Sequence, residues 1–190
     1  LGSVEPRGRA MTALVSSHWT LLDAEGHTLT RVTGAAGSWT SDGHLVEPAP
    51  RGIDVYDIAG KKRSVPLSGA APLSALGSRQ VLLSTATGLQ VLDIVAGTHQ
   101  PIGSASQLLR GATGSPDGAR VAYLDDAGAG QVLDLKGLKA QHLPAPALTT
   151  GFAWSRDAAW IGVQTVYGGA ALRLSDDMIV ASGSQVVVSW

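Results

Sequence analysis

The sequence predicts an all-β fold in which four-stranded antiparallel sheets repeat along the chain. Three observations indicate this fold. A turn that runs from aspartate to glycine occurs four times, and each copy follows a short apolar run. A second turn motif, centred on Asp-Gly, lies upstream of most copies. No stretch keeps a helical period over three turns, whereas short strand-like runs alternate with turns throughout.

The first motif spans Asp23 to Gly26, Asp57 to Gly60, Asp93 to Gly97 and Asp134 to Gly137. The predicted strands before these turns cover 19–22, 53–56, 89–92 and 131–133. An aspartate at a strand end accepts hydrogen bonds from backbone amides two residues on, and glycine completes the turn. We therefore interpret these recurring carboxylates as turn formers rather than as catalytic groups or calcium ligands.

The second motif is a hairpin turn, seen at 38–43, 114–118 and 153–158, with a degenerate copy at 73–78. Asp-Gly between two apolar runs favours a hairpin, because glycine accepts a positive φ without a Cβ clash. The strands that follow these hairpins are predicted at 44–47, 80–84, 120–124 and 160–164.

One repeat therefore contains strand a, the hairpin, strand b, a variable loop, strand c, the Asp turn and strand d. Four antiparallel strands in about 40 residues make one blade of a β-propeller. The predicted blades cover 38–67, 73–102, 113–143 and 152–182, and strands b, c and d of a further blade cover 10–16, 18–22 and 28–32. We expect a flexible lead-in over residues 1–9 and a single propeller domain over 10–190.

The two ends of the chain suggest how the propeller closes. The beginning lacks a strand a, and residues 187–190 align as a lone strand a that ends in Trp190. Together they predict five blades closed by pairing of the N- and C-terminal strands, which leaves no open sheet edge. The alternative is part of a six- to eight-bladed propeller.

Residues 152–163 resemble the WD40-like repeat of TolB-type propellers, which centres on Trp-Ser-Pro-Asp-Gly before an apolar strand. Residues 114–123 match the Ser-Pro-Asp-Gly part, and 38–46 match more loosely. Arg156 replaces the family's proline and Ala158 its last glycine. The resemblance implies a bladed ring used for binding, often outside the bacterial cytoplasm, in the periplasm or at the cell surface.

Composition argues against several classes of function. The net charge is −1, and Lys61 to Arg63 is the only basic run, so we predict no nucleic-acid partner. Cysteine is absent and the five histidines never pair at ligand spacing, so we predict no metal and no cofactor. No apolar run reaches the roughly 20 residues of a membrane-spanning helix.

Catalytic groups are also missing from the predicted inner strands. Hydrolysis of a glycoside needs a pair of carboxyl groups, and the strands a carry none. There is no G-x-S-x-G elbow and no phosphate-binding loop. We predict that the chain has no catalytic residue and is not an enzyme; a glycoside hydrolase-like or other hydrolase propeller is the alternative.

Trp39, Trp154 and Trp190 share one strand-a position, and we expect them to pack between neighbouring blades. Binding is expected at the b–c and d–a loops, which differ from blade to blade. The candidate binding residues there are Arg51, Arg110, Asp125, Asp126 and Tyr167. The predicted function is a non-catalytic scaffold that binds another protein through this loop face; a small-ligand or carbohydrate-binding propeller is the alternative.

Overall fold

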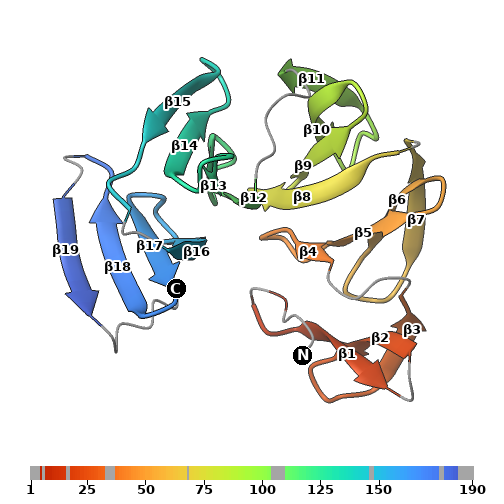
Figure 1. Ribbon diagram of the computed structural model, residues 1–190. Coiled ribbons are helices and arrows are strands. Elements are labelled where there is room, and N and C mark those ends of the chain that lie inside the picture. Colours follow the sequence, from red (N-terminus) through yellow and green to blue (C-terminus); the bar gives the residue numbers. More distant parts are fainter. Residues whose placement is uncertain are drawn as a thin grey trace. The chain divides into compact units, whose positions relative to one another are not determined.

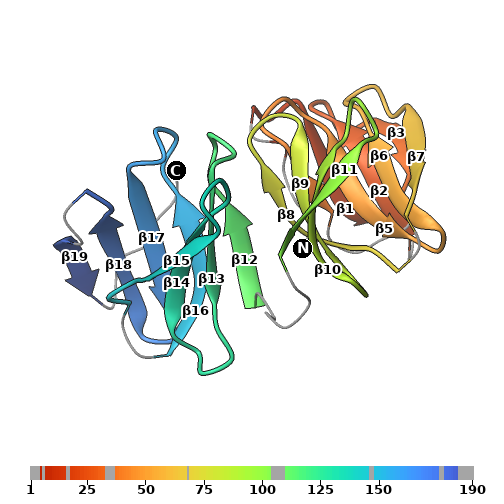
Figure 2. The ribbon, with the colours of Figure 1, turned by 90° about the horizontal axis from the view of Figure 1, so that it is seen from above.

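The structure is a computed structural model that describes residues 5, 7–15, 18–32, 37–67, 69–103, 110–145, 148–175 and 178–183. Within these ranges β-strands joined by turns are the only regular elements, as the all-β prediction required (Figures 1 and 2). The same ranges hold no helix of the length and apolarity needed to cross a bilayer. The chain divides into two compact units, Leu1–Pro101 and Ile102–Trp190, and each is described by itself.

The first unit contains three antiparallel sheets in which neighbouring strands follow one another in sequence (Figure 1). The first sheet has three strands, β1 (Ala10–Val15), β2 (His18–Asp23) and β3 (Thr28–Arg31). The second consists of β4 (Ser38–Trp39), β5 (Leu45–Ala49), β6 (Gly52–Tyr56) and β7 (Lys62–Pro66). The third consists of β8 (Ala71–Leu76), β9 (Gln80–Thr85), β10 (Gly88–Asp93) and β11 (His99–Gly103).

The second unit contains two further sheets with the same order of strands (Figure 1). One consists of β12 (Arg110–Gly114), β13 (Arg120–Leu124), β14 (Gly130–Asp134) and β15 (Lys139–His142). The other consists of β16 (Thr149–Trp154), β17 (Trp160–Thr165), β18 (Gly168–Arg173) and β19 (Met178–Gly183). We number the five sheets blades 1 to 5 in chain order, and their strands coincide with the predicted a, b, c and d to within a few residues.

The described residues cover part of the predicted N-terminal lead-in but none of the predicted C-terminal strand. The strand a expected at residues 187–190 lies outside the described residues, so closure of the propeller by the two ends stays a prediction. In the expected lead-in, Glu5 is buried and its carboxylate accepts hydrogen bonds from the backbone amides of Arg7 and Arg9. The Arg9 guanidinium forms an ion pair with Glu5 at 2.8 Å and also donates to the Asp42 carbonyl of blade 2.

Neighbouring blades within each unit pack through apolar side chains from facing sheets. Blades 1 and 2 share a cluster that includes Leu21 and Tyr56, with Trp39 packed against it. A second cluster in the first unit joins blades 2 and 3. In the second unit, Trp154 lies in the cluster between blades 4 and 5, and its Nε1 donates to the Thr113 carbonyl of blade 4 at 2.9 Å. The predicted packing role of Trp39 and Trp154 is confirmed, whereas Trp190 lies outside the described residues.

The hairpin between strands a and b is held by a buried hydroxyl in three blades. The hydroxyls of Thr40, Ser115 and Ser155 each donate to an aspartate two residues on. Each hydroxyl also accepts from the backbone amide that begins or precedes strand b. Ala158 has a φ of 55°, and the other two hairpins have glycine at this position. The backbone here is therefore left-handed in all three hairpins, although this chain has alanine where the family has glycine.

Candidate functional site

Each blade has two chemically different ends. We call the end with the hairpins and Asp turns the turn end, and the end with the b–c turns and d–a connections the loop end. At the turn end, the first carboxylate oxygen of each repeated aspartate accepts from the amide two residues on, as predicted. The four aspartates are Asp23, Asp57, Asp93 and Asp134. One oxygen of each carboxylate thus helps to form its own turn.

The hydrogen bonds lower the pKa of several turn-end carboxyls. Amide donors, first that of Ala96, lower the pKa of Asp93, and the Ser155 hydroxyl together with the Ala159 amide lowers the pKa of Asp157. Burial acts to raise the pKa of Asp117, but hydrogen bonds from the Ser115 hydroxyl and the Ala119 amide outweigh it. These three carboxyls therefore bind protons less readily in the folded chain than in a free side chain.

The predicted binding residues lie at loop ends, but they belong to different units. Arg51 lies in the β5–β6 turn of the first unit and is exposed. Asp125 and Asp126 lie in the β13–β14 turn, and Tyr167 lies in the β17–β18 turn, of the second unit. The backbone of Arg110 begins β12 opposite Leu124, which places it beside the β13–β14 turn; its side chain lies outside the described part.

Only some of these side chains are available to a ligand. The Asp125 carboxylate accepts from the amides of Ala127 and Ala129 and from the Gln131 side chain, and these bonds lower its pKa. Asp125 therefore forms its own turn, much like the Asp turns. Asp126 is exposed, and Tyr167 exposes 75% of its surface.

Exposed apolar side chains gather at the loop ends. The described residues include seven large apolar side chains that are exposed, and five of them are at loop ends. These five are Leu14, Val15, Leu148, Val166 and Tyr167. In blade 5, the Val166 amide donates to the Leu148 carbonyl at 3.4 Å, which holds Leu148 beside the β17–β18 turn. We call Leu148, Val166 and Tyr167 the blade 5 apolar patch.

A shared glycine fixes the loop-end turns. Strands β6, β10, β14 and β18 all begin with glycine, although the turns before them differ. At Gly52, φ is 149° and an added Cβ would lie 2.1 Å from the Val65 carbonyl oxygen. Glycine is required there because β7 approaches the turn so closely. The repeat of this glycine is visible in the sequence and could have been used to locate the start of strand c in blades 2 to 5.

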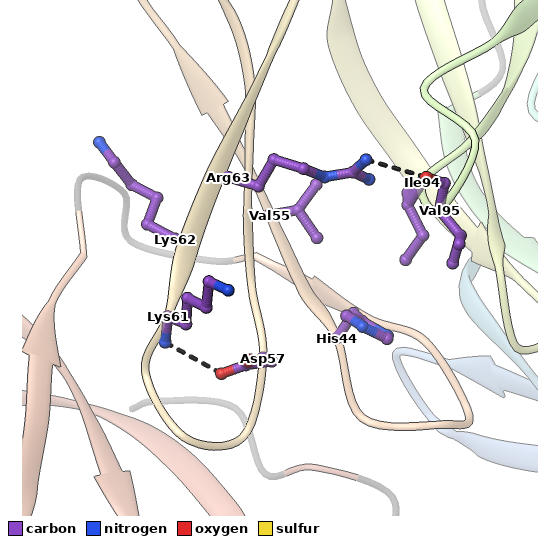
Figure 3. Close-up of a pocket in the computed structure, with 8 residues that line it drawn as sticks. All are labelled: His44, Val55, Asp57, Lys61, Lys62, Arg63, Ile94 and Val95. Atoms are coloured by element: carbon purple, nitrogen blue, oxygen red, sulfur yellow. Dashed lines mark hydrogen bonds between the residues drawn. The ribbon is translucent and has the colours of Figure 1, made fainter.

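The first unit has a cavity of about 240 Å³ between blades 2 and 3 (Figure 3). Val55, Ile94 and Val95 supply its apolar wall, and Lys61 and Arg63 supply cations. The Arg63 guanidinium spans the two blades and donates to the Val95 carbonyl at 2.9 Å. The Asp57 carboxylate accepts from the Lys61 backbone amide and not from its ammonium group. The Lys61 side chain thus remains exposed beside this groove.

A larger cavity of about 510 Å³ lies on the other side of β7, beside Arg51. Its polar lining includes Asp54, Lys62 and Ser64. Asp54 is 4% exposed, and its carboxylate accepts from the Ser64 hydroxyl and from the Lys62 ammonium group at 3.2 Å. The Asp54 contact raises the pKa of Lys62, so this lysine stays protonated at neutral pH. Sequence reasoning placed Arg51 on a loop but missed Asp54, because a charged residue inside an apolar strand carried no motif.

Among the residues that the structure describes, one group of side chains could hold a metal ion. In the blade 1 turn, ligand atoms of Asp23, Glu25 and His27 lie within 4.8 Å of one another. His27 Nδ1 and the second Asp23 carboxylate oxygen are 3.0 Å apart, so these two groups already bond to each other. The search for paired histidines missed this Asp-x-Glu-x-His spacing, which mixes ligand types.

Comparison with known proteins supports the fold. No family model matches the sequence, and no curated protein does. Among solved structures 775 chains match, and one of them is a chain in a crystal structure of the mitotic checkpoint complex. It is 16% identical, with a TM-score of 0.67, over 95% of this chain and 61% of that chain. The likeness supports a WD40-like propeller fold, and this chain spans about three fifths of the length of that neighbour.

Proposed function

We propose that this chain is a non-catalytic propeller scaffold that binds another protein through the loop ends of its blades. The observation that carries the proposal is the location of the exposed apolar side chains. Among the described residues there are seven large ones, and five of them lie at loop ends. Exposed apolar clusters mark binding surfaces because isolated soluble domains rarely keep them. Tyrosine is also among the side chains that most often dominate binding energy at protein interfaces.

The turn ends support the same proposal, because their polar side chains form hydrogen bonds within the turns. Their aspartates and hydroxyls bond to the turns themselves, which leaves the loop ends as the variable part of the repeat. The solved neighbour comes from a crystal structure of the mitotic checkpoint complex, and this is consistent with an interaction role. The resemblance of residues 152–163 to TolB-type repeats supports the proposal too, because that family uses its propellers for binding.

The carbohydrate alternative receives less support. The strand-a tryptophans offer no open sugar platform, because Trp154 is only 7% exposed and Trp39 packs against the cluster of blades 1 and 2. The exposed ring of Tyr167 is the aromatic group that this alternative would have to use. The hydrolase alternative needs a reachable carboxyl pair, whereas the described strands a carry none.

Photo-crosslinking tests the proposal. A benzophenone amino acid replaces Tyr167 in one variant and Leu138 in a control, because Leu138 is 51% exposed at a turn end. In extract from the source cells, position 167 should yield a discrete crosslinked protein and position 138 should not. The Tyr167→Ala chain, which carries no crosslinker, should bind that protein at least about tenfold more weakly than the wild-type chain does. Equal crosslinking from both positions, or none from position 167, would contradict the proposal.

A further inference from the structure

Four cations gather on the outer margin of blade 2. They are Arg51, Lys61, Lys62 and Arg63, and all four residues are exposed. We call them the basic margin. They make up four of the 14 Lys and Arg residues of the chain, and the strands d of the other blades carry no comparable run. The basic margin is thus a local feature of one blade and not part of the repeat.

The basic margin lines two hollows that flank the same strand. Lys61, Lys62 and Arg63 line the groove between blades 2 and 3, and the Lys62 side chain extends to the opposite side of β7 (Figure 3). On that side, Lys62 and Arg51 line the larger cavity. The groove has an apolar wall made by Val55, Ile94 and Val95, and Pro50 and Pro66 line the larger cavity. Ile53 and Val65 also border that cavity, but their side chains are buried in the cluster that joins blades 2 and 3.

Most of the positive charge is not neutralised by the chain. Asp54 pairs with Lys62. Among the described residues, Arg51, Lys61 and Arg63 take part in no ion pair; Arg63 donates only to a neutral carbonyl. Cations that lie around an apolar surface without anionic partners favour a ligand that supplies both carboxylates and apolar groups.

The backbone of β7 adds a third feature. β7 is an edge strand of its sheet and, among the described strands, pairs only with β6. An edge strand can accept an extended peptide through main-chain hydrogen bonds, with alternate side chains entering pockets on either side. We propose that the basic margin binds an extended acidic segment of a partner protein along β7. This proposal shares one assumption with the proposed function, namely that the partner is a protein, and it does not depend on binding through the loop ends.

Direct binding to the full chain tests the proposal without the natural partner. The probe is a fluorescein-labelled ten-residue peptide of alternating Glu and Val, and fluorescence anisotropy measures its affinity. The test variant is Arg51→Gln/Lys61→Gln/Arg63→Gln; Lys62 is kept because its loss would leave Asp54 buried without its cation. The matched control is Lys136→Gln/Lys139→Gln, which removes two exposed lysines from the corresponding turn and strand of blade 4.

The peptide should bind the wild-type chain and the control equally. The triple variant should bind about threefold more weakly for each cation removed, and all affinities should fall with added salt. Failure of the peptide to bind would overturn the proposal and leave the cations as protection of a sheet edge. Tighter binding of a ten-nucleotide single strand, or of vesicles with anionic lipid, with the same dependence on the three residues would also overturn it. Crosslinking at position 167 is a separate measurement, so failure of either proposal can be told from failure of the other.

Discussion

Trp154 shows how one residue joins two blades. Its ring is buried between blades 4 and 5, its Nε1 bonds to the Thr113 carbonyl, and the Arg120 guanidinium lies 5.4 Å from the ring centroid. Arg120 in turn donates to the Ala158 carbonyl at 3.0 Å. The side chain therefore contributes apolar burial, one hydrogen bond and one cation–π contact to the same junction.

Trp154→Ala should destabilise the protein by about 3–5 kcal/mol, because a large aromatic side chain leaves a cavity in the packed junction. Trp154→Phe should cost less, since it keeps most of the apolar contact and loses the hydrogen bond. Urea unfolding monitored by far-ultraviolet circular dichroism measures both variants. Unchanged unfolding of Trp154→Ala would mean that this ring does not join the two blades.

The close approach of β7 to Gly52 predicts that a larger residue at position 52 lowers stability. Gly52→Ala should destabilise by about 1–3 kcal/mol, because the new methyl group would contact backbone atoms of β7 that cannot move freely. Gly97→Ala is the control, since Gly97 also has a positive φ (70°) but an added Cβ has nothing within 4 Å. A loss no larger than that of the control would show that backbone conformation alone, and not the close approach of β7, requires glycine at position 52.

At the scale of the element, the turns explain why the strands were predictable and the site was not. Each Asp turn and each hairpin forms within a few residues, so its sequence alone specifies its hydrogen bonds. Strand β13, for example, covers the predicted 120–124. The cavity beside Arg51 instead depends on Asp54 and Lys62, which are brought together only by the pairing of β6 with β7. Cross-strand register of this kind is not visible in a local motif.

The turn carboxyls also predict how stability depends on pH. The pKa values of Asp42, Asp93, Asp117 and Asp157 are lowered in the fold from an ordinary value of 3.8. The unfolded chain therefore binds protons more readily than the folded chain, and acid favours unfolding. The melting temperature should be nearly constant from pH 7 to about pH 5 and should fall as the pH drops through 4 and below.

Asp93→Asn/Asp157→Asn isolates this effect, because asparagine does not titrate. Differential scanning calorimetry between pH 3 and pH 7 should show a shallower loss of stability for this double variant than for the wild-type chain. A wild-type melting temperature that stayed flat or rose on acidification would contradict the assigned hydrogen bonds.

At the scale of the whole chain, the five blades repeat their turn ends and vary their loop ends. The turn ends reuse aspartate, serine or threonine, and glycine in fixed places, because the same four-stranded plan must form in nearly every blade. In blades 2 to 5 the loop ends share the glycine that begins strand c, and they otherwise carry different charges and apolar groups. Under the proposed function, the repeated end builds the sheets and the varied end binds the partner.

Hydrogen–deuterium exchange of the full chain, with and without the protein crosslinked at position 167, tests this division of roles. The partner should slow amide exchange in the loop-end turns at 124–130 and 165–168. Exchange in the turn-end segments 23–26 and 134–137 should stay unchanged. Protection concentrated in those Asp turns, with none at the loop ends, would contradict the account.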